Sequence, residues 1–203
     1  MKKLRRIIFI LILIAAGTTT TAFAQQVSSR AKAMRMMSFA KPEYMVKDIK
    51  VFTDTMTVYT LAEYVIYPFG KWNSIEQYVT EGQIKWERKV GYQHYLDSMH
   101  VSVNTLERLD GSYINVYRSI TTGIMEMLSA KITDPEVIFE NGLHAGMSKD
   151  DVFAVFFKKY PKSYTSDICV LKVISGADEV GQIYTFQGNK LRHIQVVSKY
   201  KYY

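Results

Sequence analysis

Short runs in which apolar and polar residues alternate dominate the chain from residue 44 onwards. A period of two, with many β-branched and aromatic residues, is typical of half-buried strands. The first strands are predicted at residues 44–46, 49–52, 56–59 and 64–67. Further along, Asp110-Gly111 separates the alternating runs Val101–Thr105 and Tyr113–Tyr117, which predicts a hairpin. An apolar run follows Gly123, and Val137–Phe139 is predicted as a further short strand.

Helical spacing of apolar residues occurs in two places. Residues 73–85 begin with Ser74 and Gln77 in the spacing of a capping box, and predict a short amphipathic helix. A second helix is predicted to start at Ser148 as N-cap, because Asp150 and Asp151 follow where the helix dipole favours negative charge. We expect Pro161 to stop this helix, with Lys158 and Lys159 in its last turn.

Three strands are predicted after this second helix, at residues 168–174, 182–186 and 191–197. The pattern therefore predicts an α+β fold of antiparallel sheets with one or two packed helices, in which a C-terminal helix precedes a three-stranded meander. Residues 43–130 form a β-rich region of unknown family in this interpretation, and residues 131–203 form a second α+β region. We interpret residues 25–42 as a flexible or weakly helical lead-in.

The N-terminus has the pattern of a cleavable signal peptide, residues 1–24. A basic start precedes the apolar stretch Ile7–Ala16, which is too short to span a bilayer. Small residues at Ala22 and Ala24 predict cleavage before Gln25, and hence a periplasmic or secreted protein. An uncleaved membrane anchor is the less favoured alternative. Acylation requires a cysteine at the junction, and the only cysteine is Cys169, so no stable membrane anchor is expected after cleavage.

Net charge and cysteine content limit the classes of binding partner and the covalent links that are expected. Cleavage would remove four basic residues and lower the formal charge from +7 to +3, and no clustered basic face is apparent, so nucleic acid is not an expected partner. Arg30, Lys32 and Arg35 lie in the lead-in, where a solvated segment is favoured over contact with an acidic surface. A single cysteine forms no intramolecular disulfide, and Cys169 is predicted to be a buried strand residue.

The sequence contains no catalytic or metal signature, and no cofactor is predicted. The one local group of metal-ligand types is His94, Asp97 and His100. Neither helical nor strand spacing brings these three side chains together, so a zinc site would require a loop.

Aromatic residues are the remaining candidates for a binding site. Two groups stand out, one around the first predicted helix and one at the C-terminus: Trp72, Trp86, Tyr92, Tyr95, Tyr200, Tyr202 and Tyr203. Exposed aromatic side chains stack on sugars or anchor a protein partner. Core packing is the favoured alternative for the first group, and the tail is suited to pairing as an edge strand.

A resemblance is carried by the segment from Gly142 to Val152, which contains Gly146-Met147-Ser148 at the helix entry, and by Tyr184-Thr185-Phe186 followed by 188–194. This region, about 140–200, resembles the SmpA/OmlA (BamE-like) envelope family, which is structurally akin to the β-lactamase inhibitory protein. The resemblance implies a fold used for protein binding or inhibition. Two features depart from the family: the lipoprotein cysteine is missing, and Lys159-Tyr160-Pro161 replaces the usual Gly-x-Pro.

Three functions are compatible with these patterns. The favoured one is a non-enzymatic envelope module that binds a protein or an envelope polymer. The second is an exported hydrolase whose residues converge only in the fold. The third is a structural subunit of a surface assembly that pairs through its tyrosine-rich strands and tail.

Overall fold

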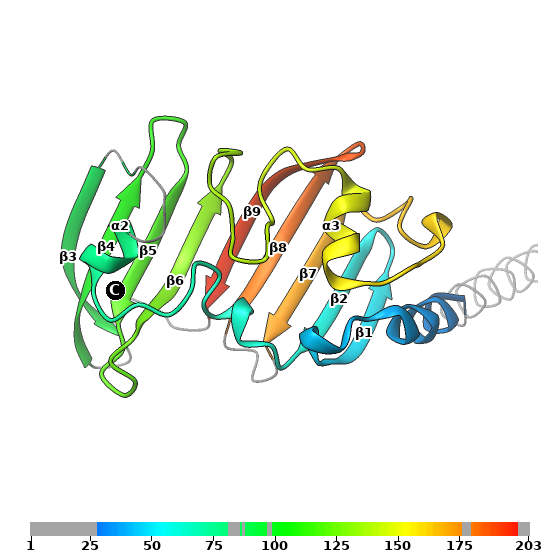
Figure 1. Cartoon of the computed structure of the whole chain (residues 1–203), viewed down its shortest axis with the longest axis horizontal. Coiled ribbons are helices and arrows are strands. Elements are labelled where there is room, and N and C mark those ends of the chain that lie inside the picture. Colours follow the sequence, from blue (N-terminus) through cyan, green and yellow to red (C-terminus); the bar gives the residue numbers. More distant parts are fainter. Residues whose placement is uncertain (1–27, 81–85, 87, 97–98, 176–179, 199–203) are drawn as a thin grey trace, which may run out of the picture.

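Nine strands form one continuous sheet in the computed structural model, which describes residues 28–80, 86, 88–96, 99–175 and 180–198 (Figure 1). The signal-peptide prediction, Asp97 and the C-terminal tyrosines lie outside the described residues. In chain order the strands are β1 Val46–Phe52, β2 Thr55–Thr60, β3 Arg88–Leu96, β4 Met99–Glu107, β5 Tyr113–Arg118, β6 Met125–Ile132, β7 Val170–Ser175, β8 Val180–Gln187 and β9 Lys190–Ser198.

The order of strands across the sheet is β1-β2-β7-β8-β9-β6-β5-β4-β3. Strands β2 and β7 are parallel, and every other neighbouring pair is antiparallel. The predicted α+β class is therefore confirmed as a sheet-rich fold with few helices.

The C-terminal helix and its three strands do not form a separate unit in this topology. Strand β7 also pairs with β2, and β9 also pairs with β6, so these strands occupy the centre of the sheet instead of a separate unit. The predicted boundary at residue 130 falls inside β6. Sequence order concealed this arrangement, because the parallel pair joins strands more than one hundred residues apart in the chain.

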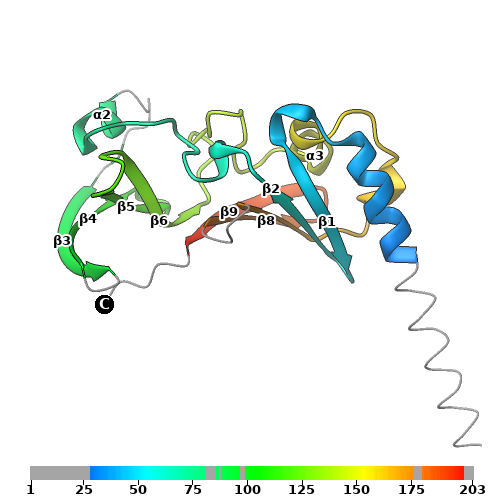
Figure 2. The ribbon, with the colours of Figure 1, turned by 90° about the horizontal axis from the view of Figure 1, so that it is seen from below.

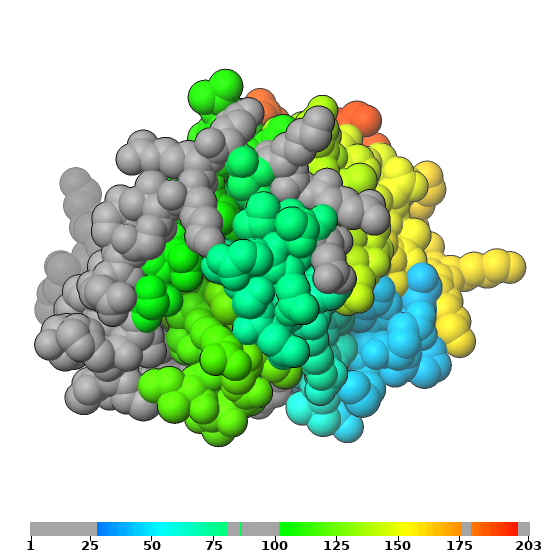
Figure 3. Space-filling view, turned by 60° about the vertical axis from the view of Figure 1, so that its left-hand side comes forward, coloured from blue at the N-terminus to red at the C-terminus, as the bar shows by residue number. Residues whose placement is uncertain are grey.

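The helices are few and short. Residues 28–39 are helical, followed by α2 Ile75–Thr80 and α3 Lys149–Phe156, with 3₁₀ turns η1 Pro42–Tyr44, η2 Glu63–Val65 and η3 Lys162–Tyr164. Figure 2 shows α2 and α3 on one side of the curved sheet and the helix over residues 28–39 beyond its β1 edge. In Figure 3 the blue-green segment that contains α2 lies across the front of the molecule, beside the green strands.

The hairpin predicted at Asp110-Gly111 is confirmed. It joins β4 to β5, and Gly111 adopts φ +86°, a left-handed conformation that favours glycine. The amide of Arg108 donates to the carbonyl of Ser112 across the turn at 2.9 Å.

Both predicted helix starts are present, and α3 ends earlier than predicted, whereas residues 81–85 of the first predicted helix lie outside the described residues. Ser148 Oγ accepts a hydrogen bond from the Asp151 amide at 3.1 Å, and Ser74 Oγ accepts one from the Gln77 amide at 3.2 Å. Helix α3 ends at Phe156, where Phe157 becomes extended and pairs with Ala40. The lysines at 158 and 159 therefore follow the helix instead of completing its last turn, and Pro161 is not its stop.

Three predicted strands are wrong. In the first, 44–46, Tyr44 belongs to η1, Met45 is left-handed with φ 43°, and Val46 alone belongs to β1. Residues 64–67 form η2 and a turn, and residues 137–139 lie in an irregular segment. Val65, Val137 and Phe139 are nevertheless fully or almost fully buried. Their apolar character reflects burial against the sheet. A segment can be buried without being a strand when side chains and turns supply the hydrogen-bond partners of its backbone N–H and C=O groups.

The lead-in is helical, and it contributes to the core. Ala33 and Met36 are buried, with Met36 at 0% exposure, and Met37 packs against the same cluster. This spacing of i, i+3 and i+4 is the period of an amphipathic helix. The prediction for Cys169 is also corrected: the residue precedes β7 and is exposed.

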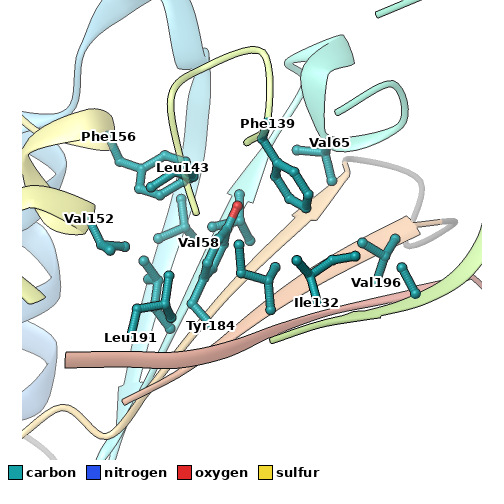
Figure 4. Packing of buried hydrophobic residues seen from close by; sticks show 14 of the residues in the cluster. Val58, Val65, Ile132, Phe139, Leu143, Val152, Phe156, Tyr184, Leu191 and Val196 are labelled. Atoms are coloured by element: carbon teal, nitrogen blue, oxygen red, sulfur yellow. The ribbon is translucent and has the colours of Figure 1, made fainter. Parts of the chain in front are cut away.

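The main core lies between the sheet and the elements on its helical side (Figure 4). Val58, Tyr184 and Leu191 rise from three strands toward Phe156 of α3, while Phe139 covers them from the irregular segment. Ring centroids of Phe156 and Tyr184 lie 5.8 Å apart at an interplanar angle of 62°, a favourable edge arrangement.

One polar side chain organises this core. Gln182 on β8 has 0% exposure, and its Nε2 donates to the carbonyls of Tyr64 and Val65, each at 3.2 Å. Its Oε1 accepts a hydrogen bond from the Tyr184 hydroxyl. Burial raises the pKa of Tyr184 well above 10.0, which keeps this phenol protonated as a donor. The side-chain amide of Gln182 thus holds η2 against the sheet through two hydrogen bonds, where no strand-to-strand backbone hydrogen bonds are formed.

Replacing Gln182 tests this role. We expect Gln182→Met to lower the free energy of unfolding by about 2–4 kcal/mol, because it leaves buried carbonyls and a buried hydroxyl without partners. Urea unfolding measures the change. The matched control is Gln187→Met on the exposed end of the same strand, which should change stability by less than about 0.5 kcal/mol. Equal stabilities of the two variants would contradict the assignment.

Candidate functional site

The aromatic residues singled out in the sequence do not form one described platform. Trp72 and Trp86 are half-buried and pack against the main core. The Trp72 indole donates to the Phe69 carbonyl at 2.8 Å, while its own carbonyl accepts from the Met125 amide at 2.8 Å. Tyr92 and Tyr95 lie in β3. The tail tyrosines Tyr200, Tyr202 and Tyr203 lie outside the described residues.

The histidines also fail to form a described site. Strand pairing places His94 opposite Val101 and His100 opposite Tyr95, so the two histidines occupy different rungs of the β3–β4 ladder. Among the described residues no group of three His, Cys, Asp or Glu side chains is arranged to hold a metal ion.

Among the described residues, a group of ionisable side chains joins the β4–β5 hairpin to the segment after β6. Arg108 forms ion pairs with Asp134 at 2.6 Å and with Glu136 at 2.8 Å. The Ser112 hydroxyl is fully buried and donates to Asp110 at 2.8 Å, while accepting from the Thr133 amide at 2.9 Å.

This group, called the clasp below, holds the hairpin to the segment after β6 and consists of Arg108, Asp110, Ser112, Thr133, Asp134 and Glu136. Burial by itself would raise the pKa of the Asp110 carboxyl, but hydrogen bonds from Thr133 and Ser112 outweigh it and lower the pKa from its ordinary 3.8. A general acid or base at neutral pH needs the opposite shift. The cluster therefore has the electrostatics of a structural contact.

The other face of the central strands provides the best candidate for a binding site. Along β7 and β8, one set of side chains faces the core, and the alternate set is half-buried on the opposite face. An open groove of about 450 Å³ lies on that opposite face. It is lined by Tyr59, Lys172, Ile174, Gly181, Ile183, Val197 and Ser198.

Gly181 forms the floor of the groove. It lies in the middle of the sheet, between Ile174 on β7 and Val197 on β9. A Cβ atom at this position would meet Ile174 Cγ1 and Val197 Cγ2, each at 3.7 Å, which is ordinary contact. The missing side chain therefore leaves a hollow that Ile174, Ile183 and Val197 border with apolar surface.

Polar and charged groups lie at one side of the groove. Lys172 belongs to β7, and Tyr59 belongs to the adjoining strand β2. The ammonium group of Lys50 lies over the Tyr59 ring, 4.8 Å from its centroid, in cation–π geometry. Its Nζ is also 4.0 Å from Asp48, an exposed contact that contributes little. The groove thus combines an apolar floor with a basic and aromatic rim.

Sequence reasoning missed this groove because its residues come from three separate regions of the chain. The available signal was local: the outward positions of β7 and β8 include the apolar residues Val170, Ile174 and Ile183. Strands of this kind are buried on both faces or form part of an interface. The topology that brings β2 beside β7 was needed to join the parts.

No family model, curated protein or solved structure matches the chain. In the described part of the chain, no helix has the length and apolar character needed to cross a membrane.

The clasp predicts a specific dependence of stability on pH. The folded pKa of Asp110 lies below the unfolded value, so its contribution is present above pH 3.8 and is lost as pH falls through the folded pKa. We expect Asp110→Asn to cost about 1 kcal/mol at neutral pH, because an amide is a weaker acceptor than a carboxylate. Urea unfolding from neutral to acid pH should show this difference shrinking as pH falls.

Glu140→Gln, an exposed carboxylate change in the following segment, is the matched control and should leave stability almost unchanged. A destabilisation by Asp110→Asn that persists undiminished in acid would contradict the hydrogen-bonded carboxylate.

Proposed function

We propose that this chain is an exported, non-enzymatic binding module of the cell envelope, which recognises a protein or an envelope polymer through the groove over Gly181. In this proposal residues 1–24 are the signal peptide, and the protein works in the periplasm or outside the cell. The apolar stretch Ile7–Ala16 and the small residues Ala22 and Ala24 support export.

The composition of the groove is the observation that carries the proposal. Its seven lining residues include no Asp, Glu, His or Cys, the residue types that supply most general acids, general bases and metal ligands. Its apolar floor and single ammonium group instead suit recognition of a partner with an apolar patch and an acidic group. A volume of about 450 Å³ accommodates a few side chains or one to two sugar units.

Two alternatives predict different behaviour. An exported hydrolase requires catalytic groups to converge, and among the described residues the main ionisable cluster is the clasp around Arg108 and Asp110. A structural subunit of a surface assembly would associate through strand edges, and the described edge β1 carries Lys47, Asp48 and Lys50, charges that oppose edge pairing.

The resemblance of residues 140–200 to the SmpA/OmlA (BamE-like) family, with its helix followed by a three-stranded meander, remains part of the proposal. It is supported by local geometry at the helix entry. Gly146 adopts φ +88°, Ser148 caps α3, and the Leu191 amide donates to the Met147 carbonyl at 2.8 Å. These contacts give each residue type of the motif a physical role. They favour a binding protein over an enzyme, since the resemblance implies binding or inhibition.

Filling the groove tests the proposed function. A photo-crosslinking amino acid at position 197, which lines the groove, is 46% exposed and leaves the Lys172 ammonium in place, would capture the partner in cells that produce the protein natively. Mass spectrometry would identify the product. We expect Gly181→Val to reduce the yield of this crosslink by roughly tenfold, which corresponds to about 1.4 kcal/mol of binding free energy. Its new methyl groups occupy the floor, and its backbone conformation suits a β-branched residue.

Thr185→Val is the matched control, because it adds the same side chain on the same face of β8 outside the groove. It should leave the crosslink intact, and thermal unfolding should show both variants folded. Crosslinks that are unchanged in Gly181→Val, or absent at position 197 throughout, would overturn the groove as the binding site.

A further inference from the structure

Two basic segments far apart in the sequence meet at the edge of the molecule formed by residues 28–41. The helix over residues 28–39 exposes Arg30 and Arg35, and Lys158 and Lys159 are exposed directly after α3. Backbone hydrogen bonds join the two segments: the Lys158 amide donates to the Phe39 carbonyl at 2.7 Å. In the opposite direction, the amide of residue 41 donates to the carbonyl of residue 156 at 2.9 Å. Half-buried Lys32 and Lys41 complete this basic patch.

The cations of the patch are not neutralised by ion pairs among the described residues. None of its six cations forms an ion pair with a carboxylate of the described chain, whereas nearby Lys162 is paired with Asp150 at 2.6 Å. The guanidinium of Arg35 donates to the hydroxyl of Tyr164 at 3.0 Å, a neutral partner that holds the side chain without neutralising it. Like charges gathered in this way oppose folding slightly, so the fold itself gives no reason for the cluster.

An exposed apolar side chain lies within the patch. Met34 is 68% exposed, one helical turn from Arg30, while Ala33 and Met36 beside it are buried in the core. A helix with basic residues and a large exposed apolar side chain on one face suits the interface of a lipid bilayer. A soluble polyanion would use the cations and would gain little from the methionine, so lipid is the favoured partner.

We propose that the basic patch docks the protein onto an anionic lipid membrane surface. Phospholipid head groups supply the negative charge that the six cations lack, and Met34 enters the head-group region. The patch also lies shortly after the apolar stretch Ile7–Ala16, so it leaves the translocation site close to a membrane. Because helix 28–39 lies beyond the β1 edge of the sheet and the groove over Gly181 lies on its central strands, docking through the helix leaves the groove uncovered (Figure 2). This peripheral contact is independent of what the groove binds.

Vesicle co-sedimentation of the exported protein tests the proposal. We expect binding to vesicles of equimolar phosphatidylglycerol and phosphatidylcholine, and none to phosphatidylcholine alone, with affinity falling as salt is raised. Each basic residue near a membrane contributes roughly fivefold in affinity, so the triple variant Arg35→Gln, Lys158→Gln, Lys159→Gln should bind roughly 100-fold more weakly. Met34→Ser should weaken binding as well, without a change in charge.

The matched control changes three exposed cations elsewhere: Lys131→Gln, Lys190→Gln and Arg192→Gln. It has the same net charge as the patch variant and should keep most of the binding, and far-ultraviolet circular dichroism should show both variants folded. Equal losses in the two triple variants would mean non-specific attraction and would overturn the patch. Patch-dependent binding to soluble polyphosphate without binding to anionic vesicles would assign these cations to an acidic polymer and overturn the membrane proposal.

Discussion

The side-chain amide of Gln182 connects the central strand β8 to the chain that covers it. Its two donors and one acceptor are all used, by the Tyr64 and Val65 carbonyls and by the Tyr184 hydroxyl. Few helices cover this sheet, so much of its core face is closed by 3₁₀ turns and irregular segments, whose backbone polar groups need partners. The fully buried side-chain amide of Gln182 supplies hydrogen-bond partners to η2, which forms no backbone hydrogen bonds with a strand at this point.

Because the turns and helices cover the core on one face of the central strands, the opposite face of these strands is not covered by them. Val173 and Tyr184 point into the core, and the alternate residues Ile174 and Ile183 therefore lie on the opposite face. There the missing side chain of Gly181 opens a groove beside Lys172. The candidate site is thus a consequence of strand alternation and one glycine, on a part of the sheet held rigid by pairing on both sides.

Two features that depend on residues close together in the sequence were predicted correctly. The hairpin at Asp110-Gly111 and the capping by Ser148 depend on residues a few positions apart, and both are present. The strand predicted at 64–67 failed because Val65 is buried through the distant Gln182. The helix at 28–39 was predicted only as the weakly helical alternative to a flexible lead-in, although Ala33, Met36 and Met37 have helical spacing, since methionines and cations together resembled a polar leader.

The candidate site could not be predicted because no local pattern contains it. Tyr59, Lys172 and Val197 meet only through the parallel pairing of β2 with β7 and the return of β9. The same is true of the basic patch, where the Lys158 amide bonds to the Phe39 carbonyl at the end of the helix that carries Arg35, a contact that sequence spacing does not reveal. In both cases residue types were recognisable, and their proximity depended on tertiary topology.

Thiol labelling inside the intact envelope tests the central claim most directly. Val197 is 46% exposed at the groove, and the native Cys169 is exposed away from it, so a Val197→Cys protein carries both a probe and an internal control. If the groove holds a partner, a membrane-permeant maleimide should label position 197 in the purified protein but much more slowly in the envelope, while Cys169 reacts equally in both. Equal reaction at position 197 in the two settings would contradict the account.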